Sequence, residues 1–190
     1  MEQARQRSAE EAYEAFCAGD ESGFDQLMRE FQQSLTCFLL GYVRAPDVAE
    51  DLAEETFVEL LLHKGRFRGQ STFKTYLYSV ARHKAIDHLR KEKRRPTVAL
   101  DDVAERGDGA PGPEEQVIAG ELAAQVARAI RAIPAEYREV MRLLYLEQMR
   151  YEEVAMLTRK SKKQVDNLAY RGRQLLKISL GREAIDFEDQ

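Results

Sequence analysis

The chain has 190 residues, of which 44% are hydrophobic and 33% are charged, so it can form one or two domains with a strongly ionised surface. No apolar run approaches the roughly 20 residues of a membrane-spanning helix, and the N-terminal segment lacks the apolar core of a secretory signal. We therefore expect a cytoplasmic protein with no membrane insertion. Two cysteines, Cys17 and Cys37, are too few for a disulfide scaffold.

The formal net charge of −4 conceals blocks of alternating sign along the chain. Residues 1–60 carry a net −10, residues 61–95 a net +9, residues 96–121 a net −6, residues 122–180 a net +6 and the last ten residues −3. Solvated helix faces account for most charge runs. So large a contrast between neighbouring segments nevertheless favours a basic region that meets a polyanion and acidic regions that meet a basic or mixed protein surface.

Helical periodicity dominates the first half of the chain. Apolar side chains at steps of three and four predict a helix over residues 24–42. A second helix is expected to begin at a capping box formed by Asp47 and Glu50, and Ser71 is expected to cap a third, which ends near residue 95. The inward side chains of the second helix are predicted to be Val48, Leu52, Phe57, Leu60 and Leu61. The pattern indicates a three-helix bundle.

A segment rich in proline and glycine separates this bundle from a second helical unit. Residues 96–114 hold three of the five prolines and have no sustained periodicity, which is typical of a linker. No strand-type alternation occurs, so the predicted fold class is all-α, with two small helical domains joined by a flexible acidic linker. The expected parts are an N-terminal extension (1–19), a first domain (20–95), the linker (96–114), a second domain (115–180) and an acidic tail (181–190).

Residues 151–177 have the proportions of a helix-turn-helix, with a break at Thr158 to Lys160. Ser161 and Gln164 form a Ser-x-x-Gln capping box that sets the start of the second helix. Such a helix fits the major groove of DNA, while the alternative interpretation is a plain helical hairpin within a bundle. The cations and ring that this helix would present are Lys162, Lys163, Tyr170, Arg171 and Arg173.

Aromatic residues alternate with cations between residues 64 and 84, as in surfaces that bind unpaired nucleic acid. Phe73 and Tyr76 fall near the apolar stripe and are expected in the core, whereas Phe67 is the better candidate for a base contact. Catalytic motifs and metal-ligand spacings are absent from the sequence. We therefore predict no catalytic residues, no metal and no cofactor, and interpret Asp51, with the two glutamates after it, as an interaction face.

Two stretches resemble the promoter-reading domains of bacterial sigma factors of the sigma-70 family. The first is DVAEDLAEETFVELLLHKGRFRGQSTFKTYLYSVARHKAIDHLRKEKRR, which resembles sigma region 2, and the second is LAAQVARAIRAIPAEYREVMRLLYLEQMRYEEVAMLTRKSKKQVDNLAYRGRQLLK, which resembles sigma region 4. Only these two domains occur in residues 20–178, which is the layout of extracytoplasmic-function (ECF) sigma factors. The resemblance implies a protein that binds the β and β′ subunits of core RNA polymerase and promoter DNA, with an anti-sigma factor as a further expected partner.

The resemblance also implies roles for particular residues. The polymerase-docking positions would be Asp47, Glu50, Asp51, Leu52, Glu54, Glu55 and Phe57. Positions that hold the unpaired −10 strand would be Arg66, Phe67, Arg68, Gln70, Ser71, Arg82, His83, Lys84 and Asp87. Positions on the −35 duplex would be Ser161, Lys162, Lys163, Gln164, Asp166, Asn167, Tyr170, Arg171 and Arg173. The acidic linker would mimic nucleic acid in the basic channels of the polymerase.

The chain departs from the family pattern in the helix-turn-helix. Arg159 and Lys160 stand where the family usually has glycine and an aliphatic residue, and Arg150 replaces the usual capping serine. Asp166 and Leu168 occupy positions that are often basic or small, so the −35 sequence is not transferable from relatives. Two alternative functions remain at this point: a free-standing helix-turn-helix repressor or activator, and a small nucleic-acid-processing enzyme that uses the carboxylates near Asp51.

Overall fold

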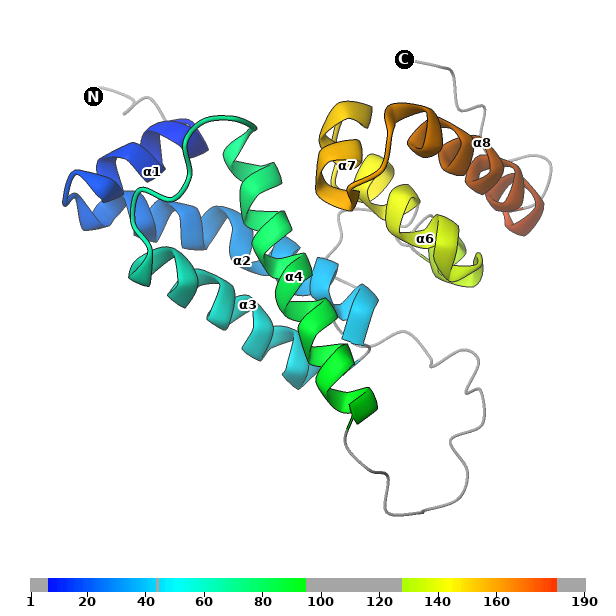
Figure 1. Ribbon diagram of the computed structural model, residues 1–190, viewed down its shortest axis with the longest axis horizontal. Coiled ribbons are helices and arrows are strands. Elements are labelled where there is room, and N and C mark those ends of the chain that lie inside the picture. Colours follow the sequence, from blue (N-terminus) through cyan, green and yellow to red (C-terminus); the bar gives the residue numbers. More distant parts are fainter. Residues whose placement is uncertain (1–6, 44, 95–127, 181–190) are drawn as a thin grey trace. The chain divides into compact units, whose positions relative to one another are not determined.

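The computed structural model describes residues 7–43, 45–94 and 128–180, and all regular structure in these residues is helical (Figure 1). The chain divides into two compact units between Pro96 and Thr97. The predicted linker, the start of the second helical unit at residues 115–127 and the acidic tail lie outside the described residues. None of the described helices has the length and apolar character needed to cross a membrane.

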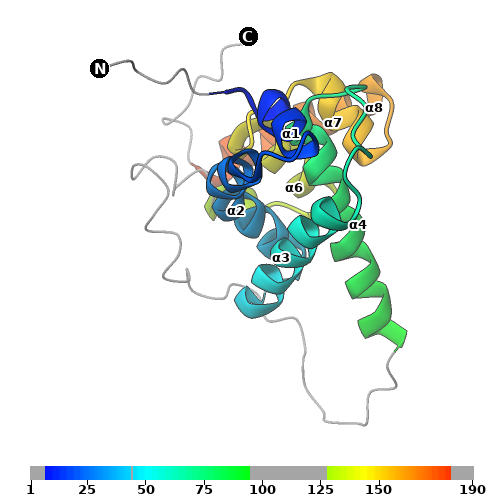
Figure 2. The same ribbon diagram turned by 90° about the vertical axis from the view of Figure 1, so that its left-hand side faces the viewer.

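The first unit contains four helices, one more than the sequence pattern predicts. These are α1 (Ala9–Cys17), α2 (Glu21–Val43), α3 (Pro46–Leu62) and α4 (Phe73–Arg94). Helix α2 packs against α1 and α3, and α4 lies across α2 and α3 (Figures 1 and 2). The last three helices confirm the predicted ones, so the predicted three-helix bundle is wrong only in lacking α1.

Helix α1 forms within the segment that was expected to be an N-terminal extension. A capping box starts it, because Ser8 Oγ accepts a hydrogen bond from the Glu11 amide at 3.2 Å while Glu11 Oε2 accepts one from the Ser8 amide at 2.8 Å. The helix buries Ala12, Tyr13 and Phe16 against the rest of the unit. It is therefore part of the hydrophobic core.

Aromatic rings connect the helices of the first unit. The Phe16 ring lies 5.1 Å from that of Phe24, which in turn lies 6.2 Å from Phe57, so the contact passes from α1 through α2 to α3. Phe38 and Tyr78 are fully buried and their rings lie 4.8 Å apart between α2 and α4. Each buried ring of this size contributes roughly 1.5–3 kcal/mol through removal of apolar surface from water.

The structure corrects three local predictions. Helix α3 begins at Pro46 with Ala45 as its N-cap, so Asp47 lies in the first turn and does not cap it. Helix α4 begins at Phe73, and the side chain that caps it belongs to Thr72, whose Oγ1 accepts a hydrogen bond from the Thr75 amide at 3.2 Å. Leu61 was expected inside but is 42% exposed, because the buried stripe passes through Leu60 instead.

The second unit is a compact array of short helices. Residues 128–132 are helical, and α6 (Ala135–Met141), a π-helical turn η2 (Arg142–Leu146), α7 (Tyr151–Thr158) and α8 (Lys162–Ser179) follow. Pro134 separates the first two segments, as predicted. One core cluster of this unit contains Ala129, Ile130, Ile133, Met141 and Leu176.

Glycine allows close helix contacts in both units. Replacement of the two glycines by alanine is expected to lower stability by different amounts. A Cβ at Gly23 would collide with the carbonyl oxygen of Ala12 and lie 2.9 Å from the Phe16 amide nitrogen, both of which are backbone atoms of α1. A Cβ at Gly172 would meet only the flexible Met141 side chain, with Sδ at 2.6 Å. Backbone atoms cannot move without displacing the helix, whereas a methionine can change rotamer.

We predict that Gly23→Ala lowers the free energy of unfolding of the first unit by about 1–3 kcal/mol, as overpacking does. Gly172→Ala should change the second unit by less than about 1 kcal/mol, because the gain in helix propensity offsets the rearrangement of Met141. Urea unfolding followed by circular dichroism would measure both. Equal effects of the two substitutions would show that α1 does not pack as described.

Candidate nucleic-acid interface

Helices α7 and α8 form the predicted helix-turn-helix. The capping box at the start of α8 is present, since Ser161 Oγ accepts from the Gln164 amide at 3.2 Å and Gln164 Oε1 accepts from the Ser161 amide at 2.8 Å. This reciprocal pair fixes the first turn of α8. It also uses one lone pair of the Gln164 carbonyl oxygen and holds the side chain against the helix start, with its amide NH₂ left to donate to a base.

The turn between the two helices contains a residue in a left-handed conformation. Arg159 has φ 56° and ψ 39°, and it ends α7 where glycine is the usual residue. A side chain in this region costs roughly 1–2 kcal/mol relative to the right-handed one. The turn is closed by the Lys160 amide, which donates to the Ala155 carbonyl at 3.0 Å. At the other end of α7, Glu153 Oε2 accepts from the Arg150 amide at 2.8 Å, so the capping at Arg150 comes from Glu153.

One face of α8 is buried and the opposite face is exposed. The buried residues Val165, Ala169, Gly172 and Leu176 recur at three- and four-residue steps and face the rest of the unit. The helical period places a second set of residues directly opposite, and all four are exposed: Lys163, Asn167, Tyr170 and Gln174. Gln174 was not predicted from the sequence, although the same period that selects Lys163 and Asn167 also selects it.

Two predicted DNA-binding cations of α8, Lys162 and Arg173, already have partners within the unit. Lys162 Nζ lies 2.6 Å from Glu152 Oε1 on α7, and this contact raises the pKa of Lys162. The nearby charge of Asp166 acts on Lys162 in the same direction. Arg173 donates to the Tyr151 hydroxyl at 2.9 Å and to the Tyr145 hydroxyl at 3.4 Å. Arg173 is therefore half-buried and connects α8 to α7 and η2.

The segment between α3 and α4, residues 63–72, is named here the recognition loop. It follows an irregular path past α1 (Figures 1 and 2), and Arg66, Arg68 and Gln70 are exposed on it. Phe67 is only half-exposed, because its ring lies 5.5 Å from Tyr13, 5.6 Å from Phe73 and 5.3 Å from Tyr76. The ring is part of an aromatic cluster, so one of its faces at most is available to a base.

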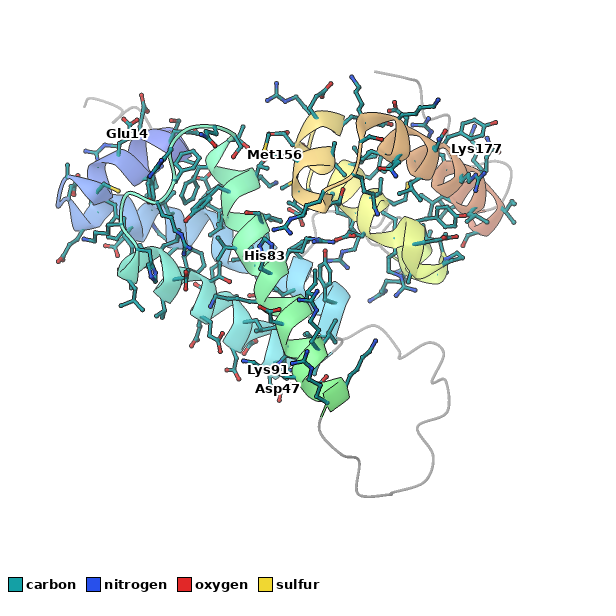
Figure 3. The ribbon with its side chains drawn as sticks, viewed as in Figure 1. Glu14, Asp47, His83, Lys91, Met156 and Lys177 are labelled. Atoms are coloured by element: carbon teal, nitrogen blue, oxygen red, sulfur yellow. The ribbon has the colours of Figure 1, made fainter. Side chains whose placement is uncertain are left out.

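Helix α4 carries the second predicted set of −10 residues. His83 lies midway along α4 and is exposed, with Lys91 close to the end of the helix (Figure 3). Arg82 and Lys84 are half-buried, and Asp87 is exposed with an oxygen 3.1 Å from the Arg90 guanidinium. The structure thus places these residues on one helix beside the recognition loop, with different degrees of access.

Glu59 of α3 is a shared partner of the basic residues. Its carboxylate lies 2.8 Å from Arg66 Nη1, 3.4 Å from His63 Nδ1 and 4.0 Å from Lys84 Nζ. Lys84 Nζ also lies 3.6 Å from Glu55. Two cations expected to hold the −10 strand therefore lie in ion pairs with α3, and DNA phosphate would have to compete with the Glu59 carboxylate for them. Sequence analysis did not find Glu59, because the pairs join residues on different elements.

The acidic residues predicted to dock on the polymerase fall into two groups. Asp47, Glu50, Asp51, Glu54 and Glu55 are exposed on α3, beside exposed Val58 and Leu62. Leu52 and Phe57 are buried in the bundle, so their side chains contact the core and are not available to a partner in this conformation. A groove of about 460 Å³ lies on this face, lined by Asp51, Glu54, Glu55, Val58, Glu59, Leu62 and Lys84.

Within the ranges 7–43, 45–94 and 128–180, no group of three or more His, Cys, Asp or Glu side chains is arranged to hold a metal ion. The carboxylates near Asp51 are spread along a solvent-facing helix. This arrangement differs from the convergent, enclosed carboxylates of metal-dependent nucleases. The geometry therefore favours a binding protein with separate basic and acidic surfaces.

Comparisons with known proteins identify both units. The family profile for sigma-70 region 2 matches residues 27–95, and that for sigma-70 region 4 matches residues 123–176. The RNA polymerase sigma-H factor of Pseudomonas aeruginosa is 29% identical, with 85% of this chain and 88% of the relative covered. The ECF sigma factor SigM of Bacillus subtilis is 29% identical, with 85% of this chain and 98% of the relative covered. The ECF sigma-E factor of Escherichia coli K12 is 30% identical, with 73% of this chain and 76% of the relative covered.

Solved structures show the same fold. A co-crystal structure of the sigma factor RpoE with the anti-sigma factor NepR from Bartonella quintana matches with a TM-score of 0.65 at 22% identity, covering 85% of this chain and 98% of that one. A structure of CnrH with the cytosolic domain of CnrY matches with a TM-score of 0.59 at 18% identity, covering 91% and 97%. At these identities the likeness concerns the fold.

These features define the class of protein, a non-enzymatic transcription initiation factor with two helical units, of which the second is the DNA-binding region 4. The chain belongs to the sigma-70 family and, within it, to the ECF sigma factors. It directs promoter-specific initiation by RNA polymerase, which performs the chemistry. The predicted function and all-α fold class are thereby confirmed, and the repressor and enzyme alternatives are set aside.

The ion pairs of Glu59 predict that its removal strengthens binding of unpaired DNA. Glu59→Gln removes the carboxylate that pairs with Arg66 and one of the two that pair with Lys84, so the affinity of the protein for a single-stranded oligonucleotide should rise several-fold at low salt. Fluorescence anisotropy at two salt concentrations measures the change. Glu30→Gln is the matched control, since it removes one exposed carboxylate from α2 of the same unit. An equal rise for both variants would mean that only net charge matters.

Proposed function

We propose that the exposed face of α3 is the surface by which this sigma factor docks on the β and β′ subunits of core RNA polymerase. Four exposed carboxylates gather there beside the apolar side chains Val58 and Leu62, which are 49% and 72% exposed. Docking on a basic and apolar partner surface would neutralise the carboxylates and bury the two side chains. The carboxylates are Asp47, Glu50, Asp51 and Glu54.

The two units would divide promoter recognition between them. The recognition loop and the neighbouring face of α4 would hold the unpaired −10 strand, while α8 would enter the major groove of the −35 duplex. The observation that carries this proposal is the geometry of α8. Its polar face, from Lys163 to Gln174, lies opposite its buried face. The capping box at Ser161 fixes the residue at which the helix begins.

Within α8, we assign phosphate contacts and base contacts to different residues. Lys163 and Arg171 are exposed cations near the two edges of the face and suit phosphate. Asn167 lies at its centre, where an amide can pair with adenine, and Gln174 lies two turns further on. Gln164 would offer its NH₂ group while its carbonyl oxygen caps α8, and Arg173 would act by orienting α8.

We also propose that the chain acts in the cytoplasm and is regulated by an anti-sigma factor. Two solved proteins of the same fold, RpoE and CnrH, are each seen with a partner, an anti-sigma factor in one case and the cytosolic domain of CnrY in the other. Val58, Leu62 and Met156 are exposed apolar side chains of the described residues that such a partner would cover. Co-purification with a cytosolic partner that blocks polymerase binding would test this proposal.

Charge reversal on α3 tests the docking surface. Asp51→Lys together with Glu54→Lys should weaken the affinity for core polymerase at least tenfold, because it replaces attraction by repulsion at the interface. The melting temperature should stay nearly constant, since both side chains are exposed. The matched control is Asp25→Lys with Glu30→Lys on α2, which changes the net charge equally. Unchanged polymerase affinity in the α3 variant would exclude this face as the docking surface.

Substitutions on α8 test the division between phosphate and base contacts. Lys163→Ala should weaken binding to all −35 sequences alike and reduce the salt dependence by about one unit of slope. Asn167→Ala should instead change the preferred base at one position, at a cost of about 1–3 kcal/mol for the original sequence. Selection from a randomised −35 library with each variant distinguishes the two effects. A parental sequence preference in Asn167→Ala would refute the assignment of Asn167.

A further inference from the structure

Helix α1 holds the recognition loop at several points along its length. The Tyr13 hydroxyl accepts hydrogen bonds from the Gly65 amide at 2.9 Å and from the Phe67 amide at 3.4 Å. Glu10 Oε1 accepts one from the Phe73 amide at 2.8 Å, where the loop enters α4. Lys64 Nζ lies 4.2 Å above the centre of the Phe16 ring. Three residues along one helix, Glu10, Tyr13 and Phe16, thus contact the loop or its junction with α4.

The loop depends on such external partners because its own backbone is irregular. Gly65 and Gly69 have φ of +80° and +69°, a region in which side chains are rarely found, and both mark sharp changes of direction. Between these glycines lie Arg66, Phe67 and Arg68. The Tyr13 hydroxyl contacts the amides on either side of Arg66, so it fixes the direction in which this guanidinium leaves the main chain.

Tyr13 is suited to this contact at neutral pH. Burial raises the pKa of its hydroxyl, although the Phe67 amide acts in the opposite direction, so the group stays protonated and neutral. Its ring is almost completely buried and lies 5.2 Å from Phe73 and 5.5 Å from Phe67. The ring therefore belongs to the core, while the hydroxyl alone reaches the loop.

We propose that Tyr13 is a positioning residue for promoter opening: its hydroxyl holds the main chain at Gly65 and Phe67 so that the loop presents Arg66 and Arg68 to the unpaired strand. The inference rests on the proposed function of the loop as the −10 strand site. It assigns to α1, which is separated from the loop by about 50 residues of sequence, a part in DNA recognition in addition to its part in the core.

Tyr13→Phe is the decisive variant, because it keeps the ring and removes only the hydroxyl. The probe is a single-stranded oligonucleotide selected from a random pool by the unsubstituted holoenzyme. Four quantities are measured: affinity of the variant holoenzyme for this probe, hydrogen exchange of the loop amides, affinity for core polymerase, and the melting temperature of the free protein. We expect the affinity for the probe to fall about three- to tenfold, as for loss of one hydrogen bond. Exchange at Gly65 and Phe67 should accelerate, with polymerase affinity and melting temperature unchanged.

Two further variants separate possible causes. Tyr42→Phe also removes one tyrosine hydroxyl from the first unit, at a position where the ring packs on Phe38 of α2. It should leave probe affinity and loop exchange unchanged. Glu10→Ala removes the hydrogen bond from the Phe73 amide to α1 at the start of α4 and should accelerate exchange at that amide. Agreement between Tyr13→Phe and Glu10→Ala in lowering probe affinity would support positioning by α1.

The outcomes that overturn the inference are distinct from those that overturn the proposed function. Accelerated exchange with unchanged probe affinity, unchanged exchange, or a fall in probe affinity matched by a fall in melting temperature would each refute positioning by Tyr13. Arg66→Ala combined with Arg68→Ala tests the loop itself. If that double variant binds the probe normally, the loop is not the strand site and both proposals fail. If it loses affinity while Tyr13→Phe does not, only the inference fails.

Discussion

The first unit depends on how an irregular loop is held between two helices. Residues 63–72 lack the repeating hydrogen bonds of a helix, and buried or half-buried amides need partners. Those partners come from α1 through the Tyr13 hydroxyl and the Glu10 carboxylate. The side chains of the loop are held from the other side by Glu59 of α3, which pairs with Arg66. Helices α1 and α3 therefore hold one short segment of basic residues from two sides.

Glu59 also marks the place where two surfaces of opposite charge meet. On one side lie the exposed carboxylates of α3, and on the other lie the cations of the loop and α4. Because both surfaces belong to one rigid bundle, a partner that docks on α3 changes the electrostatic surroundings of the cations beside it. If the proposed assignments of these two surfaces hold, docking on polymerase and binding of an unpaired strand take place side by side on the bundle.

In the second unit, contacts along α8 hold this helix with a defined face outward. The start of α8 is fixed by Ser161 and Gln164, its middle by the close approach of Gly172 to Met141, and one edge by Arg173 on two tyrosines. Each contact uses a side of the helix away from Lys163 and Asn167. The central residues of the exposed face therefore do not take part in the contacts that hold α8 in place, which suits them to base recognition.

Local sequence patterns predicted much of this architecture. The periodicity of residues 24–42 and the capping box at Ser161 gave helices that the structure contains. Helix α1 was not predicted because its segment is strongly charged, although Ser8 and Glu11 form a capping box of the same kind as Ser161 and Gln164. Tyr13, Glu59 and Arg173 were not interpretable in this way, since their partners lie on other elements. Leu52 and Phe57 were assigned to docking from the resemblance, yet the fold buries them.

The central claim is that this chain gives core RNA polymerase its promoter specificity through two separate DNA contacts. The most direct measurement is transcription by core polymerase with and without the protein on a library of randomised templates, followed by sequencing of the templates that yield transcripts. The account predicts enrichment of two short sequence blocks at a fixed spacing upstream of the start, only when the protein is present. Transcripts without such enrichment, or the same enrichment with polymerase alone, would contradict it.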